Sequence, residues 1–239
     1  MTPPIRAMLL AAGLGTRLRP ITINTPKCLV HVAGEALLGR WLQQLESAGC
    51  EEVLINTHYL AEQVVDFLKN WHSTQMLIVT TYESELLGTA GTLLANQSFF
   101  EGSTGLLIHA DNAMEGDLQE LIAAHKNCSK QCLLTMLTFQ TDRPKSCGIV
   151  ATDSDGIVTG FYEKVDNPPG DCANGALYVF DKPLIDHVLR MSPPPSDFST
   201  EVIPSLLGKI QSWQTYKPYL DIGTPGALAQ AQALLSPIS

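Results

Sequence analysis

Two glycines and three cations lie close together near the start of the chain. Gly13 and Gly15 follow an apolar run, and Arg17, Arg19 and Lys27 come soon after them. Because glycine has no Cβ, its backbone N–H group can approach an anion closely, and arginine and lysine side chains add positive charge. The stretch therefore indicates a binding site for a phosphate chain. A turn with a purely structural role is the alternative that these residues alone leave open.

The glycine spacing differs from that of two better-known phosphate-binding motifs. A dinucleotide-binding fingerprint requires a glycine where Leu18 stands. A P-loop requires Gly-Lys-Ser or Gly-Lys-Thr after four intervening residues, where this chain has Leu18-Arg19-Pro20. Both motifs are therefore excluded.

Two aspartates follow short apolar runs and are candidate metal ligands. Asp111 comes after Leu106–Ile108, and Asp221 comes after Tyr219-Leu220. A carboxylate at the carboxyl end of a strand in an α/β sheet is well placed to hold Mg²⁺ beside a phosphate ligand. A cap or a turn is the alternative for each of them, and for Asp117 we expect a helix cap.

Two polar pairs lie next to other predicted strands. Glu163-Lys164 follows the run Ile157–Tyr162, and Asn174-Gly175 opens the next run. Carboxylate and amide groups hydrogen-bond sugar hydroxyls, and a lysine neutralises a phosphate. As isolated pairs they do not identify a ligand. The six histidines show no metal-ligand spacing, and we assign them to packing or to the surface.

The spacing of apolar residues predicts alternating strands and helices in the first half of the chain. The expected helices cover Glu35–Ala48, Ala61–Lys69 and Leu118–His125, and the expected strands cover Val53–Ile55, Met76–Thr80 and Leu106–Ile108. Such alternation favours a parallel sheet covered by helices, which binds ligands where its strands end.

The second half of the chain has turn-rich links between short strand-like runs, so we expect antiparallel strands to join the first sheet. These strands cover Leu133–Phe139, Gly148–Thr152, Ile157–Tyr162 and Ala176–Phe180. Helices are expected over Pro183–Leu189, Phe198–Leu206 and Thr224–Leu235, the last with a threonine cap and a proline at its first position. We therefore predict one α/β domain over residues 1–239, a Rossmann-like three-layer sandwich with a mixed, mainly parallel central sheet.

The composition is that of an acidic protein with a sizeable core. Hydrophobic residues make up 45% of the 239 residues, and the formal net charge is −9. General electrostatic attraction to nucleic acid or to an anionic membrane is therefore not expected. The first residues lack the layout of a signal peptide and the length of a membrane span, so we expect a cytoplasmic protein. The six cysteines lack paired spacing and are expected to be free thiols.

The ordered motifs resemble those of the sugar-1-phosphate nucleotidylyltransferases, also called nucleotide-sugar pyrophosphorylases, over nearly the full length. The resemblance is carried by Leu10–Leu18, Pro26-Lys27, Leu87–Gly91, Ala110–Asn112, Gly148–Val150, Glu163-Lys164, Asn174–Tyr178 and Asp221–Pro225. It is strongest to short members of the mannose-1-phosphate guanylyltransferase type. The expected protein is a monomer or a small homo-oligomer, without the C-terminal left-handed β-helix of many relatives.

The resemblance implies a reaction and a set of residues. In that family a sugar 1-phosphate oxygen attacks the α-phosphorus of a nucleoside triphosphate, pyrophosphate leaves, and positioning and charge neutralisation do most of the catalysis. Arg17 and Lys27 are then catalytic, at the leaving pyrophosphate and the α-phosphate, and Asp111 and Asp221 hold Mg²⁺. The implied nucleotide-binding residues are Leu10, Ala11, Ala12, Gly13, Gly15, Thr16, Glu85, Gly88 and Thr89. The implied sugar-phosphate-binding residues are Asn112, Gly148, Glu163, Lys164, Asn174 and Gly175.

The nucleotide and the sugar are less closely defined by the motifs. Leu87–Gly91 is similar to the base-proximal segment of mannose-1-phosphate guanylyltransferases and their heptose relatives, and Glu85 can accept hydrogen bonds from guanine. We expect GTP and mannose or heptose 1-phosphate as substrates. A UTP-dependent enzyme for amino-sugar 1-phosphates and a non-catalytic, nucleotide-sugar-binding regulatory relative are the alternatives. His109-Ala110-Asp111 departs from the usual Asn-Gly-Asp and removes a glycine beside the metal aspartate.

Overall fold

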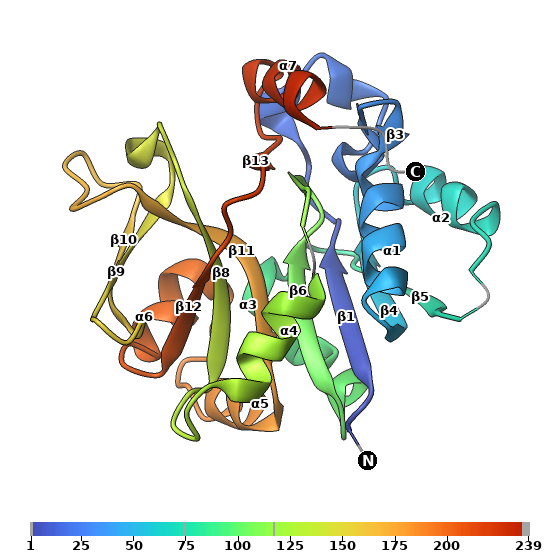
Figure 1. Cartoon of the computed structure of the whole chain (residues 1–239). Coiled ribbons are helices and arrows are strands. Elements are labelled where there is room, and N and C mark those ends of the chain that lie inside the picture. Colours follow the sequence, from blue (N-terminus) through green and yellow to red (C-terminus); the bar gives the residue numbers. More distant parts are fainter. Residues whose placement is uncertain (1, 74, 117, 236–239) are drawn as a thin grey trace. The chain divides into compact units, whose positions relative to one another are not determined.

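A computed structural model of the chain describes residues 2–73, 75–116 and 118–235 (Figure 1). The chain forms a mixed α/β fold, which confirms the predicted class. It divides into two compact units, each built from separate stretches of sequence. Unit 1 combines the residues up to Pro4 with Leu87–Leu107 and Gln119–Tyr216, and unit 2 combines Ile5–Leu86, Ile108–Leu118 and the stretch from Lys217 onward.

Unit 2 contains three neighbouring parallel strands. β4 (Cys50–Thr57) lies between β1 (Ile5–Leu10) and β5 (Leu77–Tyr82). The middle residues of β1 and β4 are buried apolar side chains, as expected of parallel strands that are covered on both faces. The helices of this part are α1 (Leu37–Ser47) and α2 (Ala61–Lys69). The unit thus presents the carboxyl ends of its parallel strands together at one edge.

Two small antiparallel pairs complete unit 2. β2 (His31–Val32) and β3 (Glu35–Ala36) form a hairpin whose two turn residues both have positive φ, 52° at Ala33 and 88° at Gly34. Gln232 of α7 (Pro225–Leu234) bonds the hairpin backbone, because its side chain accepts from Ala33 N and donates to the His31 carbonyl. The second pair joins β7 (Asn112–Met114) to β13 (Tyr219–Asp221).

Unit 1 is built around β11 (Cys172–Phe180). β11 pairs antiparallel with β8 (Leu134–Gln140) and with β9 (Gly148–Thr152). Beyond these, β10 (Val158–Glu163) lies antiparallel to β9, and β12 (Ile210–Gln214) lies parallel to β8. On the other side, β6 (Thr104–His109) follows β11 in the strand order (Figure 1). The helices are α3 (Gly88–Ala95), α4 (Leu118–Asn127), α5 (Lys182–Leu189), the π-helix Phe198–Val202 and α6 (Ile203–Ser205).

Most of the expected elements are present, and the differences have simple causes. α1 begins at Leu37 instead of Glu35, because Glu35 and Ala36 pair with β2. The expected helix over Phe198–Leu206 is a π-helix followed by one short α-helical turn. Thr224 caps α7 as predicted, since its hydroxyl accepts from Ala227 N at 3.2 Å. α3, β12 and the two small antiparallel pairs were not predicted.

Some expectations concern the chain as a whole. All six cysteines are free, as expected. Among the helices of the described residues, none is long and apolar enough to cross a membrane. The prediction of Asp117 as a helix cap falls on a residue outside the described ranges. The prediction of a single domain over the whole chain stays a prediction.

Candidate functional site

The glycine loop begins where β1 ends. A buried amide anchors its first residue, because the Asn56 side-chain oxygen accepts from Ala11 N at 2.7 Å. Leu10 is anchored as well, because its carbonyl accepts from Ala110 N. After Gly13, which is exposed, the chain turns through three short 3₁₀ helices, Thr16–Leu18, Ile21–Ile23 and Lys27–Leu29. The loop therefore lies at the carboxyl edge of the parallel strands, where ligands bind in such sheets.

Gly15 is the residue on which this loop turns. Its φ is 62°, a left-handed value that glycine adopts without cost. The buried Thr22 hydroxyl donates to the Gly15 carbonyl at 2.6 Å. A Cβ on Gly15 would lie 3.0 Å from Thr22 Cγ2 and 3.3 Å from Lys27 Cβ. The missing side chain thus lets Thr22 and Lys27 pack directly against the loop.

The two predicted metal aspartates meet through the pairing of β7 with β13. This antiparallel pair places Asp221 opposite Asn112, next to Asp111 in the sequence. The Asp111 carbonyl also accepts from Ile222 N at 3.1 Å. Gly223 follows, where a Cβ would lie 3.0 Å from Asp221 Oδ1 and 3.1 Å from Arg17 Nη2. Two residues far apart in the sequence are therefore held side by side by backbone hydrogen bonds.

Lys27 connects the glycine loop to both aspartates. Its Nζ lies 2.5 Å from Asp111 Oδ2 and 3.6 Å from Asp221 Oδ1. Arg17 Nη2 lies 3.9 Å from Asp221 Oδ2 on the more exposed side of the group. Burial alone would raise the pKa of Asp111, but Lys27 and His109 hold it below its usual range. The structure thus brings together Arg17, Lys27, Asp111 and Asp221, whereas Arg19 is exposed.

The donor set of this group fits a hard divalent cation. Asp111 and Asp221 direct carboxylate oxygens at one ammonium group, and their side chains remain 32% and 52% exposed, so both can still reach a ligand from solvent. Mg²⁺ is commonly held by one or two carboxylates together with substrate phosphates and water. In the described ranges there is no group of three or more acidic, histidine or cysteine ligands, so the other ligands of a Mg²⁺ held here would be substrate oxygens and water.

A buried acid next to the glycine loop was missed by the sequence analysis. Glu83 is 5% exposed, and its Oε1 accepts from Asn56 Nδ2 at 2.9 Å. The same Asn56 side chain holds Ala11 through its oxygen, so one amide positions both the loop and the carboxylate. Glu85, which the sequence analysis favoured, is exposed. The available signal was Asn56, a polar residue directly after the apolar run Val53–Ile55.

The other predicted nucleotide-binding residues, Gly88 and Thr89, lie in unit 1 at the start of α3. Gly88 has a φ of 77°, and a Cβ there would clash with the Ser196 carbonyl. That carbonyl accepts from Ala90 N at 2.9 Å, and the Thr89 hydroxyl accepts from Phe198 N at 2.7 Å. The π-helix that begins at Phe198 therefore holds this segment in place.

The predicted sugar-phosphate residues, apart from Asn112, also lie in unit 1. Glu163 ends β10, and its Oε1 lies 2.8 Å from Lys164 Nζ. A Cβ on Gly148 would lie 2.5 Å from Glu163 Oε2, so only glycine admits the carboxylate at this position. Lys164 has a φ of 49°, an uncommon value for a residue with a side chain. Asn112 instead lies in β7 of unit 2 and is buried.

Asn174 and Gly175 lie at an irregularity in β11. The register with β8 shifts between Asn174 and Tyr178, and Ala176 within this bulge has a φ of 51°. Asn174 Oδ1 accepts from Ala176 N at 2.9 Å, and its Nδ2 donates to the Tyr178 hydroxyl at 2.8 Å. Bulges often re-aim side chains next to functional sites. The bulge and Tyr178 together fix the orientation of the Asn174 amide.

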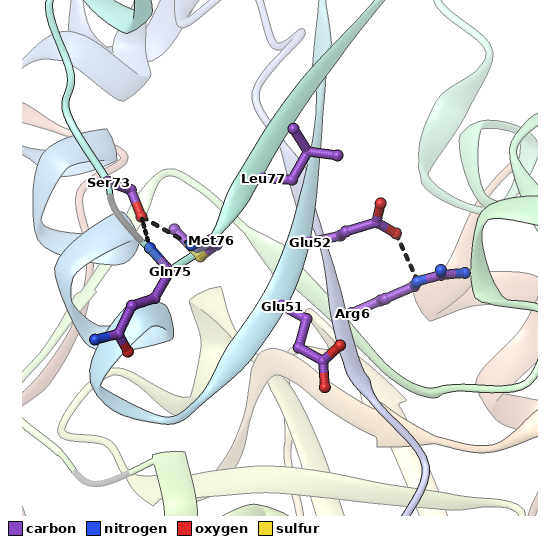
Figure 2. Close-up of a pocket in the computed structure, with 7 residues that line it drawn as sticks. All are labelled: Arg6, Glu51, Glu52, Ser73, Gln75, Met76 and Leu77. Atoms are coloured by element: carbon purple, nitrogen blue, oxygen red, sulfur yellow. Dashed lines mark hydrogen bonds and ion pairs between the residues drawn. The ribbon is translucent and has the colours of Figure 1, made fainter.

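A cavity of about 520 Å³ in unit 2 lies away from this chemistry. Figure 2 shows the seven residues that line it, among them the ion pair between Arg6 and Glu52. They come from the first residues of β1, the first residues of β4, and the approach to β5. Because the strands are parallel, this is the amino edge of their sheet, opposite to the edge that carries the glycine loop.

Named proteins are similar to this chain over most of its length. A mannose-1-phosphate guanylyltransferase catalytic subunit beta from Drosophila pseudoobscura pseudoobscura is 30% identical over 225 residues, which cover 92% of this chain and 59% of the relative. A mannose-1-phosphate guanylyltransferase from Mycobacterium tuberculosis is 29% identical and covers 97% of this chain and 65% of the relative. The chain thus spans about 60% of the length of such relatives.

Solved structures share the fold. A structure from Bacillus anthracis, provisionally named a glucose-1-phosphate thymidylyltransferase, has a TM-score of 0.88 at 20% identity, covering 98% of this chain and 96% of its own. HddC from Yersinia pseudotuberculosis, complexed with GMP-PN, has a TM-score of 0.79 at 24% identity, covering 95% and 98%. The family model described as nucleotidyl transferase matches residues 6–236. This chain therefore belongs to the nucleotidyl transferase family.

Proposed function

We propose that the protein transfers a nucleotidyl group from a nucleoside triphosphate to a sugar 1-phosphate and releases pyrophosphate. The observation that carries the proposal is the cluster at the edge of unit 2. Two cations and two carboxylates meet there beside a glycine loop, with Lys27 in contact with both Asp111 and Asp221. Such a cluster can neutralise a phosphate chain and hold a metal ion, as nucleotidyl transfer requires.

The proposed roles follow from position and exposure. Lys27 is nearly buried and reaches inward, which suits contact with the α-phosphate where charge builds up during attack. Arg17 is 64% exposed and lies further out, which suits the leaving pyrophosphate. The backbone of the glycine loop would hold the triphosphate, and Asp111 and Asp221 would hold Mg²⁺, which neutralises phosphate oxygens when bound. Gly148, Glu163, Lys164 and Asn174 of unit 1 are the proposed contacts of the sugar phosphate.

GTP is the proposed nucleotide, and mannose or heptose 1-phosphate the proposed acceptor. Guanine presents N–H donors on its Watson–Crick edge, and a carboxylate held by an amide is a suitable acceptor for them. The buried Glu83, fixed by Asn56 next to the loop, supports this choice better than the exposed Glu85. The relatives of about 30% identity are named mannose-1-phosphate guanylyltransferases, which also supports it.

A matrix of the four nucleoside triphosphates against mannose, heptose, glucose and amino-sugar 1-phosphates tests the proposal, with pyrophosphate release as the readout. We expect release with GTP and mannose or heptose 1-phosphate, dependent on Mg²⁺ and abolished by EDTA. Asp111→Ala should remove most of the turnover, while Asp66→Ala, at an exposed surface ion pair, should leave it unchanged. Absence of pyrophosphate release from every substrate pair, with binding of a nucleotide sugar intact, would support a regulatory protein instead.

A further inference from the structure

We propose that Lys27 is an internal counter-ion that holds the cation position between Asp111 and Asp221 until substrates bind. A free divalent metal must then compete with the lysine for the two carboxylates. The inference extends the proposed function and rests on it, because it takes Asp111 and Asp221 as the Mg²⁺ ligands proposed above. It assigns Lys27 a second task, which it performs in the absence of nucleotide.

The surroundings of Lys27 leave its charge few other partners. The side chain is 9% exposed, so the ammonium group has little access to water in its present place. Asp111 Oδ2 at 2.5 Å and Asp221 Oδ1 at 3.6 Å supply the negative charge that it needs. The adjacent Cys28 is buried, and burial raises the pKa of its thiol to about 12, so this thiol stays neutral. The ammonium group therefore depends on the same two carboxylates that a metal would use.

The charges of the group already balance. Lys27 and Arg17 carry two positive charges, and Asp111 and Asp221 carry two negative charges. A divalent ion that entered alone would add two positive charges to this neutral cluster. It would also have to displace the nearly buried ammonium group of Lys27, which occupies the same position. A triphosphate removes this obstacle, because its oxygens give both Lys27 and Arg17 new anionic partners. Metal and triphosphate should therefore each increase the affinity of the other.

The test measures Mn²⁺ binding to the nucleotide-free protein, by the loss of the free Mn²⁺ signal in electron paramagnetic resonance. Lys27→Gln keeps the length of the side chain and removes its charge, so we expect it to bind Mn²⁺ roughly tenfold more tightly than the wild type, or better. Lys27→Arg keeps the charge and should bind Mn²⁺ as weakly as the wild type. Adding Asp111→Asn to Lys27→Gln should cancel the gain, which locates the binding at this pair.

Equal Mn²⁺ affinity in the wild type and in Lys27→Gln would overturn the inference. Should Lys27→Gln fail the folding check by circular dichroism, Arg17→Gln tests the same competition at the exposed carboxylate, with an expected gain of about threefold. An unchanged affinity in Arg17→Gln would then count against the inference. Because no substrate is present, these results are independent of the pyrophosphate assay, and either proposal can fail without the other.

Discussion

Gly15→Ala should destabilise unit 2 through two separable effects. The first is conformational, because a Cβ in the left-handed region costs about 1–2 kcal/mol. The second is crowding, since the new Cβ would lie 3.0 Å from Thr22 Cγ2 and 3.3 Å from Lys27 Cβ. Overpacking of this kind typically costs about 1–3 kcal/mol. The free energy of unfolding should therefore fall by about 2–5 kcal/mol in total.

Two other glycines of unit 2 separate these effects. Gly34 has a φ of 88° but nothing within 4 Å of its would-be Cβ, so Gly34→Ala should cost only the conformational part, about 1–2 kcal/mol. Gly13 has neither a positive φ nor a neighbour within 4 Å, so Gly13→Ala should be neutral or stabilising by up to about 1 kcal/mol. Gly13→Ala is therefore the control for adding a methyl group to this loop.

Urea unfolding of the wild type and the three variants, followed by circular dichroism and tryptophan fluorescence, gives the required free energies. We expect Gly13→Ala to be the most stable of the three variants, Gly34→Ala to be intermediate and Gly15→Ala to be the least stable. Turnover should fall in Gly15→Ala because Lys27 is displaced, and it should be retained in Gly34→Ala. If Gly15→Ala is no less stable than Gly34→Ala, the close packing of Thr22 and Lys27 on the loop has no energetic role and the reasoning is refuted.

Two further predictions concern buried or paired acids. Glu83→Gln should lower the preference for GTP over the other triphosphates in the matrix assay by about tenfold, because an amide accepts fewer hydrogen bonds than a carboxylate. Glu85 is exposed, so Glu85→Gln should leave this preference unchanged. His125, whose Nε2 lies 3.7 Å from Asp181 Oδ2, lowers the pKa of Asp181, so this contact stabilises the fold above the unfolded pKa of about 4 and is lost as the pH falls through the lowered value. Asp181→Asn should thus reduce the urea midpoint near neutral pH and have little effect near pH 3; an equal effect at both pH values would contradict it.

The elements with strong apolar periodicity could be predicted from the sequence. The runs that became β4 and β6 are uninterrupted, and Asp111 was correctly expected close to the end of the second of these strands. The hairpin of β2 and β3 was missed because Glu35 and Ala36 continue the helical pattern of α1 in sequence. Glu35 and Ala36 form a strand because their backbone pairs with Val32 and His31, and this pairing cannot be recognised from the apolar periodicity.

The candidate site could be predicted only residue by residue. Asp111 and Asp221 were each expected near a strand end, but their convergence depends on the pairing of β7 with β13, which no local pattern encodes. Asn56 carried a readable signal, as a polar residue at the end of an apolar run. Thr22 carried none, because its role arises from the close approach to Gly15. The bulge of β11 at Asn174 was equally invisible, since it is a register shift against β8.

The pairing of β7 with β13 also determines at which point of its synthesis the protein can assemble the candidate site. Unit 2 is interrupted by unit 1, and its third stretch begins only at Lys217. A nascent chain that has not yet delivered this stretch has the glycine loop, Lys27 and Asp111, but β7 still lacks its partner and Asp221 is absent. Premature termination before residue 217 should therefore yield a chain with an open strand edge and an incomplete candidate site. The order of the sequence thus makes the second carboxylate available only after unit 1 has been synthesised.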